Sequence, residues 1–239
     1  MRADDFLYPT DAGLYCPPGD FFIDPVRPVP RALITHGHGD HARAGHGAVM
    51  ATRETLDIMA IRYGEDFTAA RQVADGPVRV GGVAVSFHPA GHILGSAQIR
   101  LACQGGPVIT VSGDYCRTPN PVCAPWEPVA CDIFVTEATF GLPVFRHPDP
   151  AAETRRLLAS MAEFPDRAHL VGAYALGKAQ RVIALVRQAG HDGPIHLHGA
   201  VQRLTDYHVE QGIALGDLRP ATVPKEIEAI HLANGWSGV

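Results

Sequence analysis

Short apolar runs separated by turn residues characterise the first half of the chain. These runs are rich in β-branched residues and are bounded by glycine, proline and polar residues, which is typical of β-strands. We expect five such strands, at residues 32–35, 83–88, 97–102, 108–112 and 133–136. Turn residues at 81–82 and 104–106 predict a sheet built largely from hairpins and short connections. One helix is expected at residues 52–62, where Leu56 and Met59 share a face.

The second half of the chain has a different periodicity. Apolar residues recur every three or four positions in two segments, which predicts amphipathic helices, and two short apolar runs beside them predict buried strands of a parallel strand–helix–strand unit. We expect the helices at residues 151–163 and 176–188, and the strands at residues 169–174 and 194–198. Prolines cluster between the two halves, so we predict one domain at residues 1–142 and a second at residues 143–239.

The composition is that of a folded protein with a sizeable core. The chain has 239 residues, of which 46% are hydrophobic and 19% are charged. No apolar run approaches the length of about 18 residues that a membrane span needs, and the N-terminal segment lacks the apolar stretch of a signal peptide. We therefore expect a cytoplasmic protein without membrane association. The five cysteines form no CxxC pair, which favours reduced thiols over disulfides or a thiolate zinc site.

Charge and histidine content narrow the classes of function. The net charge of −5 argues against a protein that coats nucleic acid in general. It does not exclude a nuclease, because a local basic groove or a bound cation can still attract phosphate. Thirteen histidines point to metal chemistry before electrostatic binding.

The stretch THGHGDH places histidines and an aspartate directly after a predicted strand. In an extended segment, residues two apart point the same way, so His36 and His38 can converge on one ion. Asp40 and His41 follow where the chain turns, and they can face a second ion. Imidazole and carboxylate groups suit zinc, with manganese or iron as alternatives. Histidines on a solvated surface are the other interpretation, but the full pattern after a strand favours a metal site, with His46 outside it.

Other strands also end on residues whose side chains can bind a metal or take part in catalysis, and strand ends are rigid supports for a site. His92 follows one strand, Asp114 a second and Glu137 a third. We prefer His92 to His88 as a ligand because the loop GHxxGS is suited to present one, and Asp114 could bridge two ions. Asp24 could hold a ligand imidazole through its other N–H, or it could simply be a turn aspartate before a proline.

Several motifs together resemble a known protein superfamily. HGHGDH, AGHILGS and SGDY are similar to motifs of the metallo-β-lactamase superfamily, and VTEATFG and AYALGKAQR resemble those of its β-CASP nucleases. YPTDAGLYCPPGDFFIDP, HPAGHILGSAQIR and YALGKAQRV are most similar to the bacterial ligase-associated DNA exonucleases, proteins often described as mRNA 3′-end processing factors. The motifs occur in the family's order and cover residues 7–220.

The resemblance implies an α/β fold, an αββα metallo-β-lactamase sandwich with a partial β-CASP lobe, and metals at the sheet edge. The implied ligands of the first ion are His36, His38, His92 and Asp114. The implied ligands of the second ion are Asp40, His41 and Asp114. Asp24 and Glu137 take two further motif positions. The family's two late histidine motifs find no match after residue 220, where His231 lacks their flanking residues, so we expect a truncated or divergent C-terminus and a second ion that lacks one ligand.

The implied activity is metal-dependent phosphodiester hydrolysis by a DNA exonuclease that acts in repair and ligation. The cofactor would be one or two Zn²⁺ ions, with Mn²⁺ possible, and an ATP-dependent DNA ligase would be a functional partner. Asp40 or Asp114 would orient the attacking water, and Glu137 would support a histidine of the lobe. Lys178 and Arg181 share a helix face and could contact phosphates, although ordinary solvated charges are the alternative.

Three other functions fit the same residues. The first is an RNA-processing endonuclease, which could use the same metal site. The second is a small-ester or thioester hydrolase of the wider superfamily, against which VTEATFG and ALGKAQR argue. The third is a metal-binding but inactive nucleic-acid-binding remnant.

Overall fold

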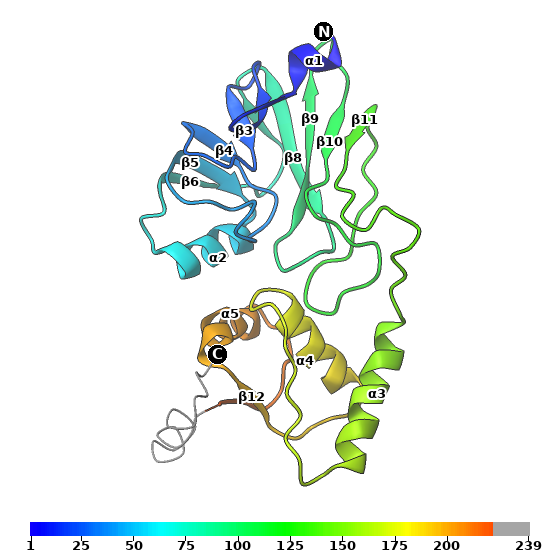
Figure 1. Ribbon diagram of the computed structural model, residues 1–239. Helices are drawn as coiled ribbons and strands as arrows, with labels where there is room; N and C mark the ends of the chain where they lie inside the picture. The colour runs from blue at the N-terminus through cyan, green and yellow to red at the C-terminus, as the bar shows by residue number, and fades with distance from the viewer. Residues whose placement is uncertain (222–239) are drawn as a thin grey trace.

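A computed structural model describes residues 1–221 of the chain. Figure 1 shows two lobes joined by a long connection: an upper lobe that contains two sheets and a lower lobe built mainly from helices. The upper lobe begins with the short helix α1 (Ala3–Phe6) and ends with the last strand of the second sheet. The domain boundary predicted between residues 142 and 143 falls in the connection between the lobes.

The first sheet of the upper lobe has six strands that follow one another in chain order. They are β1 (Tyr8–Thr10), β2 (Gly13–Cys16), β3 (Phe21–Ile23), β4 (Arg31–Leu33), β5 (His46–Ala51) and β6 (Thr68–Val73). β1 to β3 pair antiparallel, whereas β3 to β6 pair parallel. The expectation of a sheet made largely from hairpins is therefore wrong for this part. The parallel pairs need longer connections, which here are two loops and a helix.

That helix, α2 (Arg53–Tyr63), confirms the helix expected at residues 52–62. It begins after Thr52, whose side chain accepts a hydrogen bond from the backbone N–H of Thr55 and so satisfies one of the amides at the helix start. Its apolar residues Leu56 and Met59 pack on the outer face of the first sheet, against residues of β4 and β5.

The second sheet contains the four strands predicted at residues 83–88, 97–102, 108–112 and 133–136. Its strands are β7 (Val78–Val80), β8 (Val83–Pro89), β9 (Ala97–Cys103), β10 (Ile109–Val111) and β11 (Ile133–Val135), in the order β11-β10-β9-β8-β7. β7 to β10 form antiparallel hairpins as expected, and β11 joins β10 in parallel. Gly81 turns the chain between β7 and β8 with a φ of 56°, a conformation that glycine adopts without strain.

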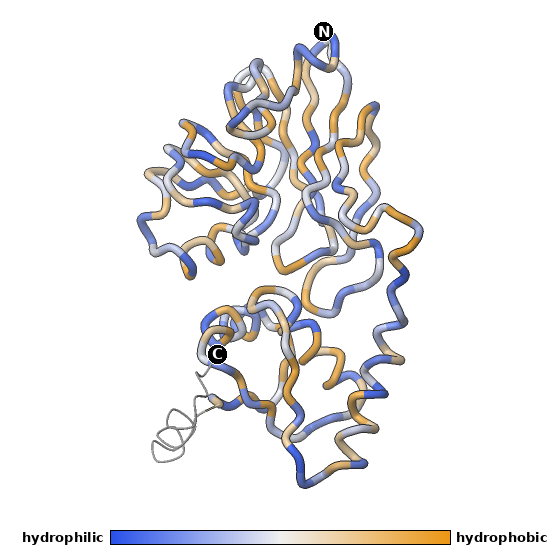
Figure 2. Tube along the Cα trace, in the orientation of Figure 1, coloured by the Kyte–Doolittle hydropathy of each residue, from blue (hydrophilic) through white to orange (hydrophobic). Residues whose placement is uncertain are grey.

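The two sheets face each other across an apolar core. Ile99 and Leu101 on β9 are fully buried there and pack with residues of β2 to β5, and Figure 2 shows apolar residues recurring along these strands. The outer face of the second sheet meets the segment that follows β10, where the Gln98 side chain donates to the Glu127 carbonyl. The mixed α/β sandwich of the metallo-β-lactamase type is confirmed, and within residues 1–221 a helix packs on its first sheet only.

The lower lobe is smaller and mostly helical. It comprises α3 (Pro150–Glu163), α4 (Lys178–Gln188), β12 (Ile195–Leu197), α5 (Gly199–Glu210) and β13 (Leu218–Pro220). The parallel strands β12 and β13 form its sheet. Arg187 on α4 fastens the turns around this sheet, because its guanidinium donates to four backbone carbonyl groups. The structure describes no helix that is long and apolar enough to cross a membrane.

One strand prediction in the lower lobe is wrong. Residues 169–174 form no strand, and their apolar side chains are exposed: Leu170 by 89% and Tyr174 by 72%. The parallel partner of β12 is instead β13, which lies later in the chain. An apolar run is buried only where a neighbouring element covers it, and nothing in the described part of the chain covers this one. Tyr174, which falls in the buried strand predicted at residues 169–174, is therefore not a core residue.

The lobes meet at a cluster of apolar side chains that we call the interlobe cluster. The upper lobe contributes Ile58, Ile93 and Leu94, and the lower lobe contributes Leu176, Leu204 and Tyr207. The Tyr207 hydroxyl also donates a hydrogen bond of 2.8 Å to the Asp57 carboxylate on α2. A second contact lies at Val122, which packs into the apolar cluster of the lower lobe.

Candidate metal centre

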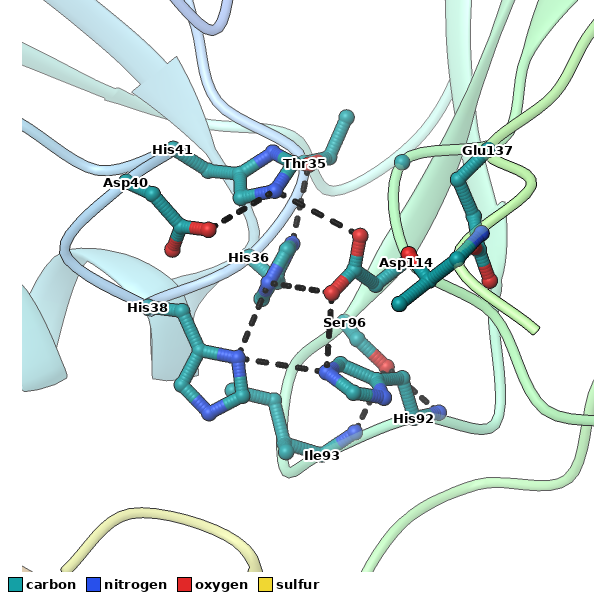
Figure 3. Close-up of polar contacts among 12 residues, drawn as sticks. Thr35, His36, His38, Asp40, His41, His92, Ile93, Ser96, Asp114 and Glu137 are labelled. Carbon is teal, nitrogen blue, oxygen red and sulfur yellow. Dashed lines mark hydrogen bonds and ion pairs between the residues drawn. The ribbon is translucent and has the colours of Figure 1, made fainter. Parts of the chain in front are cut away.

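Four predicted ligands lie together at the edge of the upper lobe that faces the lower lobe. His36 and His38 follow β4, His92 follows β8 and Asp114 follows β10. One donor atom of each lies within 4.8 Å of all the others. Figure 3 shows the four side chains pointing toward one another, with Asp40 and His41 beside them.

The spacing of the donor atoms fits a small divalent cation. His38 Nδ1 lies 3.1 Å from His36 Nε2 and 3.2 Å from His92 Nε2. The Asp114 Oδ2 atom lies 3.8 Å from His36 Nε2 and 3.5 Å from His92 Nε2. Ligand nitrogens about 2.05 Å from a tetrahedral zinc ion are separated by roughly 3.3 Å. These four separations between the donor atoms of three imidazoles and one carboxylate lie near that value.

The hydrogen bonds around His36 determine which of its nitrogens is a donor to a metal. The Thr35 hydroxyl donates to Asp24 Oδ2 over 2.6 Å, so its oxygen is left to accept from the ring of His36. His36 Nδ1 lies 3.1 Å from that oxygen and carries the proton. The lone pair of a neutral His36 is therefore on Nε2, the nitrogen that faces the cluster.

The same reasoning applies to His38. Its Nε2 atom lies 3.2 Å from the carbonyl oxygen of Leu176, which can only accept, so Nε2 carries the proton and Nδ1 carries the lone pair. Two nitrogen lone pairs, on His36 Nε2 and His38 Nδ1, then face each other across 3.1 Å. Such an arrangement is repulsive unless a cation lies between them. The proton positions thus fit a metal ion better than they fit a hydrogen bond.

Burial keeps these imidazoles in the neutral form that binds metals. Desolvation lowers the pKa of His36 well below its ordinary value, and the neighbouring imidazoles lower it further. Burial also lowers the pKa of His38. The pKa of His92 falls to about 4, first because of burial and then because of His38. At neutral pH all three rings offer lone pairs.

A second group of donors adjoins the first through Asp114. While Oδ2 of Asp114 faces the imidazole cluster, its Oδ1 atom lies 3.4 Å from His41 Nε2. Asp40 Oδ2 lies 3.8 Å from the same nitrogen. The carboxylate of Asp114 thus presents one oxygen to each side, which is the arrangement of a bridging ligand. Asp40, His41 and Asp114 could hold a second ion.

The surroundings of His41 favour its doubly protonated, cationic form in the metal-free protein. Burial alone would lower its pKa, but the hydrogen bonds to Asp114 and Asp24 outweigh burial and raise the pKa to about 10. The same contact with His41 holds the pKa of Asp114 well below its usual range. A second ion would therefore have to displace a proton from His41, whereas an ion at the first set meets neutral imidazoles.

Asp24 lies beneath the site and contacts three groups. Its carboxylate accepts hydrogen bonds from the Thr35 backbone N–H over 2.8 Å and from the Thr35 hydroxyl, and it lies 2.8 Å from His41 Nδ1. Its backbone has a φ of 43°, in the left-handed region. The sequence left two interpretations of Asp24, a partner of a ligand imidazole or a turn aspartate before a proline. Its contact with His41 has the geometry of the first.

Several groups at the site were not identified from the sequence. The Ser96 hydroxyl accepts hydrogen bonds from the backbone N–H groups of His92 and Ile93, and the Asn120 amide donates to the His92 carbonyl over 2.8 Å. These contacts fix the loop that carries His92. Ser96 lies in the motif AGHILGS and Leu176 in the motif AYALGKAQR, but neither motif shows that these residues contact the site, and Asn120 is 28 positions from His92.

The other candidate residues near the cluster have different surroundings. Glu137 lines a hollow of about 340 Å³ together with Asp24, Asp40 and His41, and its carboxylate accepts from the Thr139 backbone N–H. His88 lies outside the cluster, with its ring 2.9 Å from the Ser86 hydroxyl. His46 also lies outside it, but His46 is 2% exposed on β5 and is not a surface residue.

The two basic residues predicted to bind nucleic acid differ in exposure. Lys178, the first residue of α4, is exposed, and its Nζ atom lies 4.8 Å from the centre of the Tyr174 ring. Arg181 is half-buried, and its buried Nε atom has no hydrogen-bond partner in residues 1–221. The exposed pair of cation and aromatic ring was not foreseen from the sequence.

Comparisons with known proteins find relatives but no matching family model. The chain is 28% identical over 219 residues to a probable DNA ligase of Opitutus terrae, covering 87% of this chain and 20% of that protein. It is 26% identical over 190 residues to the RNase aCSPSF2 of Saccharolobus solfataricus, covering 77% of this chain and 35% of that protein. The chain thus spans between a fifth and about a third of these curated relatives.

A solved structure supports the fold. A protein of unknown function from Enterococcus faecalis V583 matches with a TM-score of 0.50 and 14% sequence identity, covering 83% of this chain and 52% of that chain. At this level of identity the match bears on the fold alone. Together, the sequence relatives and the two-sheet fold show that the chain is related to the β-CASP proteins of the metallo-β-lactamase superfamily.

Proposed function

We propose that the chain provides the metal centre of a hydrolase that cleaves phosphodiester bonds in nucleic acid. The observation that carries this proposal is the cluster of His36, His38, His92 and Asp114, with Asp114 turned toward a second group of donors. The relatives named for ligase and ribonuclease functions support nucleic acid as the substrate. A hydrolase of small esters could use the same metal donors, but the segments VTEATFG and ALGKAQR, which resemble those of the β-CASP nucleases, argue against it.

The substrate that we favour is DNA, degraded from one end by an exonuclease that acts with an ATP-dependent DNA ligase. The motifs most similar to the ligase-associated family and the relative named as a probable DNA ligase support this assignment. The second candidate is cleavage of RNA by an endonuclease, which the relatives named as ribonucleases favour.

A divalent cation, Zn²⁺ or Mn²⁺, would supply the positive charge that polarises a phosphodiester and favours deprotonation of water. The residues of the chain hold and orient the reactants. Asp114 presents its two oxygens to the two groups of donors, so it can fix a water between them. Asp40, whose Oδ2 atom lies 3.8 Å from His41 Nε2, belongs to the second group of donors, and it or Asp114 would orient the attacking water. Glu137 lines the hollow beside Asp40 and His41, where it would support a histidine of the lobe through a hydrogen bond.

Lys178 and Arg181 are proposed to contact the backbone of the substrate. Lys178 is at the start of α4, immediately after the loop that contacts His38. The ammonium group of Lys178 could bind a phosphate, and the neighbouring Tyr174 ring could stack on a base. Lys178→Ala should weaken DNA binding and reduce its salt dependence by about one phosphate contact. Arg155→Ala, which removes an exposed arginine from α3, is the matched control.

The proposal is tested with the purified chain and end-labelled DNA and RNA of one sequence, with added Zn²⁺ or Mn²⁺. Stepwise shortening of DNA from one end would support it. Internal cuts confined to RNA would favour the second candidate, and turnover of nitrocefin or a thioester would favour a small-ester hydrolase. Tight metal binding without any cleavage would contradict an enzymatic function and would favour a nucleic-acid-binding remnant.

A double variant tests the assignment of the site. His36→Ala/Asp40→Ala removes one donor from each group and should abolish cleavage of every substrate. His88→Ala, which removes an imidazole outside the cluster, should leave cleavage unchanged. Full activity of the double variant would show that the metal centre has been placed on the wrong residues.

A further inference from the structure

The imidazoles of the metal centre are oriented by partners of different origin. The His36 ring contacts Thr35 and the His41 ring contacts Asp24, all within the upper lobe. The His38 ring instead contacts the carbonyl oxygen of Leu176, which belongs to the lower lobe and lies 138 positions further along the chain. One donor of the upper lobe is therefore oriented by the lower lobe.

The lower lobe holds this carbonyl group rigidly. The Leu176 side chain is 5% exposed in the interlobe cluster. The next backbone N–H, that of Gly177, donates to Gln180 Oε1 over 2.8 Å, and the Gln180 amide donates to the Ala175 carbonyl and to the Thr205 hydroxyl. Gln180 itself is fully buried. Because each of these groups is paired, the carbonyl of Leu176 moves only if the start of α4 moves with it.

Gly177 is what permits the close approach of the two lobes at this point. Its φ of 87° is in the left-handed region, and a Cβ atom there would overlap the Ile93 side chain, next to the ligand His92. The same atom would lie 3.9 Å from His38 Nε2. A side chain at position 177 would therefore push the start of α4 away from both ligand loops.

We propose that the Leu176 carbonyl is the positioning group of His38, so that docking of the lower lobe and metal binding stabilise each other. The inference rests on the metal centre of the proposed function. A carbonyl that fixes the proton on Nε2 leaves Nδ1 ready for a metal, and loss of such a partner typically weakens metal affinity by about 10–100-fold. Linkage is reciprocal, so a bound metal must also strengthen docking of the lobe.

Two glycine variants separate this role from general strain. Gly177→Ala introduces the overlap with Ile93 and should displace the carbonyl from His38. Gly190→Ala is the matched control at the other end of α4, because Gly190 has a similar φ of 93° but no atom within 4 Å of its Cβ position. Both variants carry the strain of a left-handed alanine, and only the first one acts on the lobe contact.

The first measurement uses metal-free protein and does not depend on activity. Long-range ¹H–¹⁵N NMR of the histidine rings should show His38 protonated at Nε2 in the wild type and in Gly190→Ala, and a mixture of tautomers in Gly177→Ala. The second measurement, competition with a zinc chelator, should show affinity about 10–100-fold weaker in Gly177→Ala only. An unchanged tautomer and an unchanged affinity in Gly177→Ala would overturn the inference.

A milder variant covers the case in which Gly177→Ala fails to fold. Tyr207→Phe removes the hydrogen bond to Asp57 and leaves the ring in the interlobe cluster. Amide hydrogen exchange at residues 175–181 should quicken in this variant, and zinc should restore its protection. Exchange that is indifferent to zinc would refute the coupling. A protein that binds zinc, shows the coupling and cleaves nothing would refute the proposed nuclease but not this inference.

Discussion

The two lobes obtain their internal order in different ways. In the upper lobe, two sheets enclose an apolar core, and residues such as Leu101 have no exposed surface. In the lower lobe, the apolar cluster is small, and Arg187 links the turns around β12 and β13 through four backbone carbonyls. The donors of the candidate metal centre all belong to the lobe with the larger core. Close packing fixes side-chain positions most tightly, so a site that needs accurate geometry is best supported there.

The largest expected effect tests whether the upper lobe alone supplies the metal donors. Asp114→Asn keeps the shape of the side chain but removes the charge that both donor groups share. We expect cleavage to fall by about 10³-fold, or roughly 4 kcal/mol, because the ion supplies several kcal/mol of charge stabilisation. Metal content and cleavage rate are the measurements. His196→Ala, in which an exposed histidine of β12 is removed, is the control from the lower lobe, and a comparable loss there would break the comparison.

The next effect concerns the two apolar cores. Leu101→Ala leaves a cavity between the sheets and should lower the free energy of unfolding by about 3–4 kcal/mol. Leu197→Ala, in the cluster of the lower lobe, should cost about 2 kcal/mol, because its smaller surroundings can close around the gap more easily. Urea unfolding followed by circular dichroism measures both values. Equal losses would mean that the lobes are packed alike.

A smaller effect is expected at the arginine that joins the turns of the lower lobe. Arg187→Lys keeps the charge but cannot donate to four carbonyl groups at once, so several of them lose their partner. We expect a loss of about 2 kcal/mol in the free energy of unfolding. The exposed Arg155→Lys should change stability by less than about 0.5 kcal/mol. If Arg187→Lys were equally harmless, the lower lobe would not depend on these hydrogen bonds.

The smallest expected effect is the contribution of the lower lobe to the pH dependence of the free energy of unfolding. His208 on α5 is fully buried, and burial lowers its pKa below the value of about 6.5 in an unfolded chain. The unfolded state therefore takes up a proton first as the pH falls below 6.5, and stability is lost over that range. The loss in the free energy of unfolding between pH 7 and pH 6 should be smaller in His208→Gln than in the wild type, by less than about 1 kcal/mol. The same slope in wild type and variant, measured by urea unfolding at each pH, would contradict the assignment.

Local patterns were sufficient to predict much of the upper lobe. The strands at residues 83–88 and 97–102 were recognisable because their apolar residues face a core, and the two-residue spacing of His36 and His38 indicated convergent side chains. β6 escaped prediction because it is a polar strand at a sheet edge, with most of its residues exposed. The segment at residues 169–174 misled in the opposite direction, since an apolar run does not reveal whether an element covers it.

The proton arrangement of the site could not be predicted from the sequence. The tautomer of His36 depends on a hydroxyl that is itself engaged by Asp24, and the tautomer of His38 depends on a carbonyl of Leu176. The first relation depends on the proton direction of a hydroxyl, which a residue type does not reveal. The second joins residues 138 positions apart through a backbone carbonyl, which every residue type has. A motif can name ligands, but it cannot show what orients them.

The left-handed backbone of Asp24 limits which amino acids its position can accept. Glycine, asparagine and aspartate are the residues that adopt such a φ readily. Glycine would leave the Thr35 hydroxyl and the His41 ring without their acceptor, and asparagine would offer one oxygen where two are used. Backbone conformation and hydrogen bonding together therefore leave aspartate as the one residue that meets both demands, so a library of all substitutions at this position should return a single functional solution.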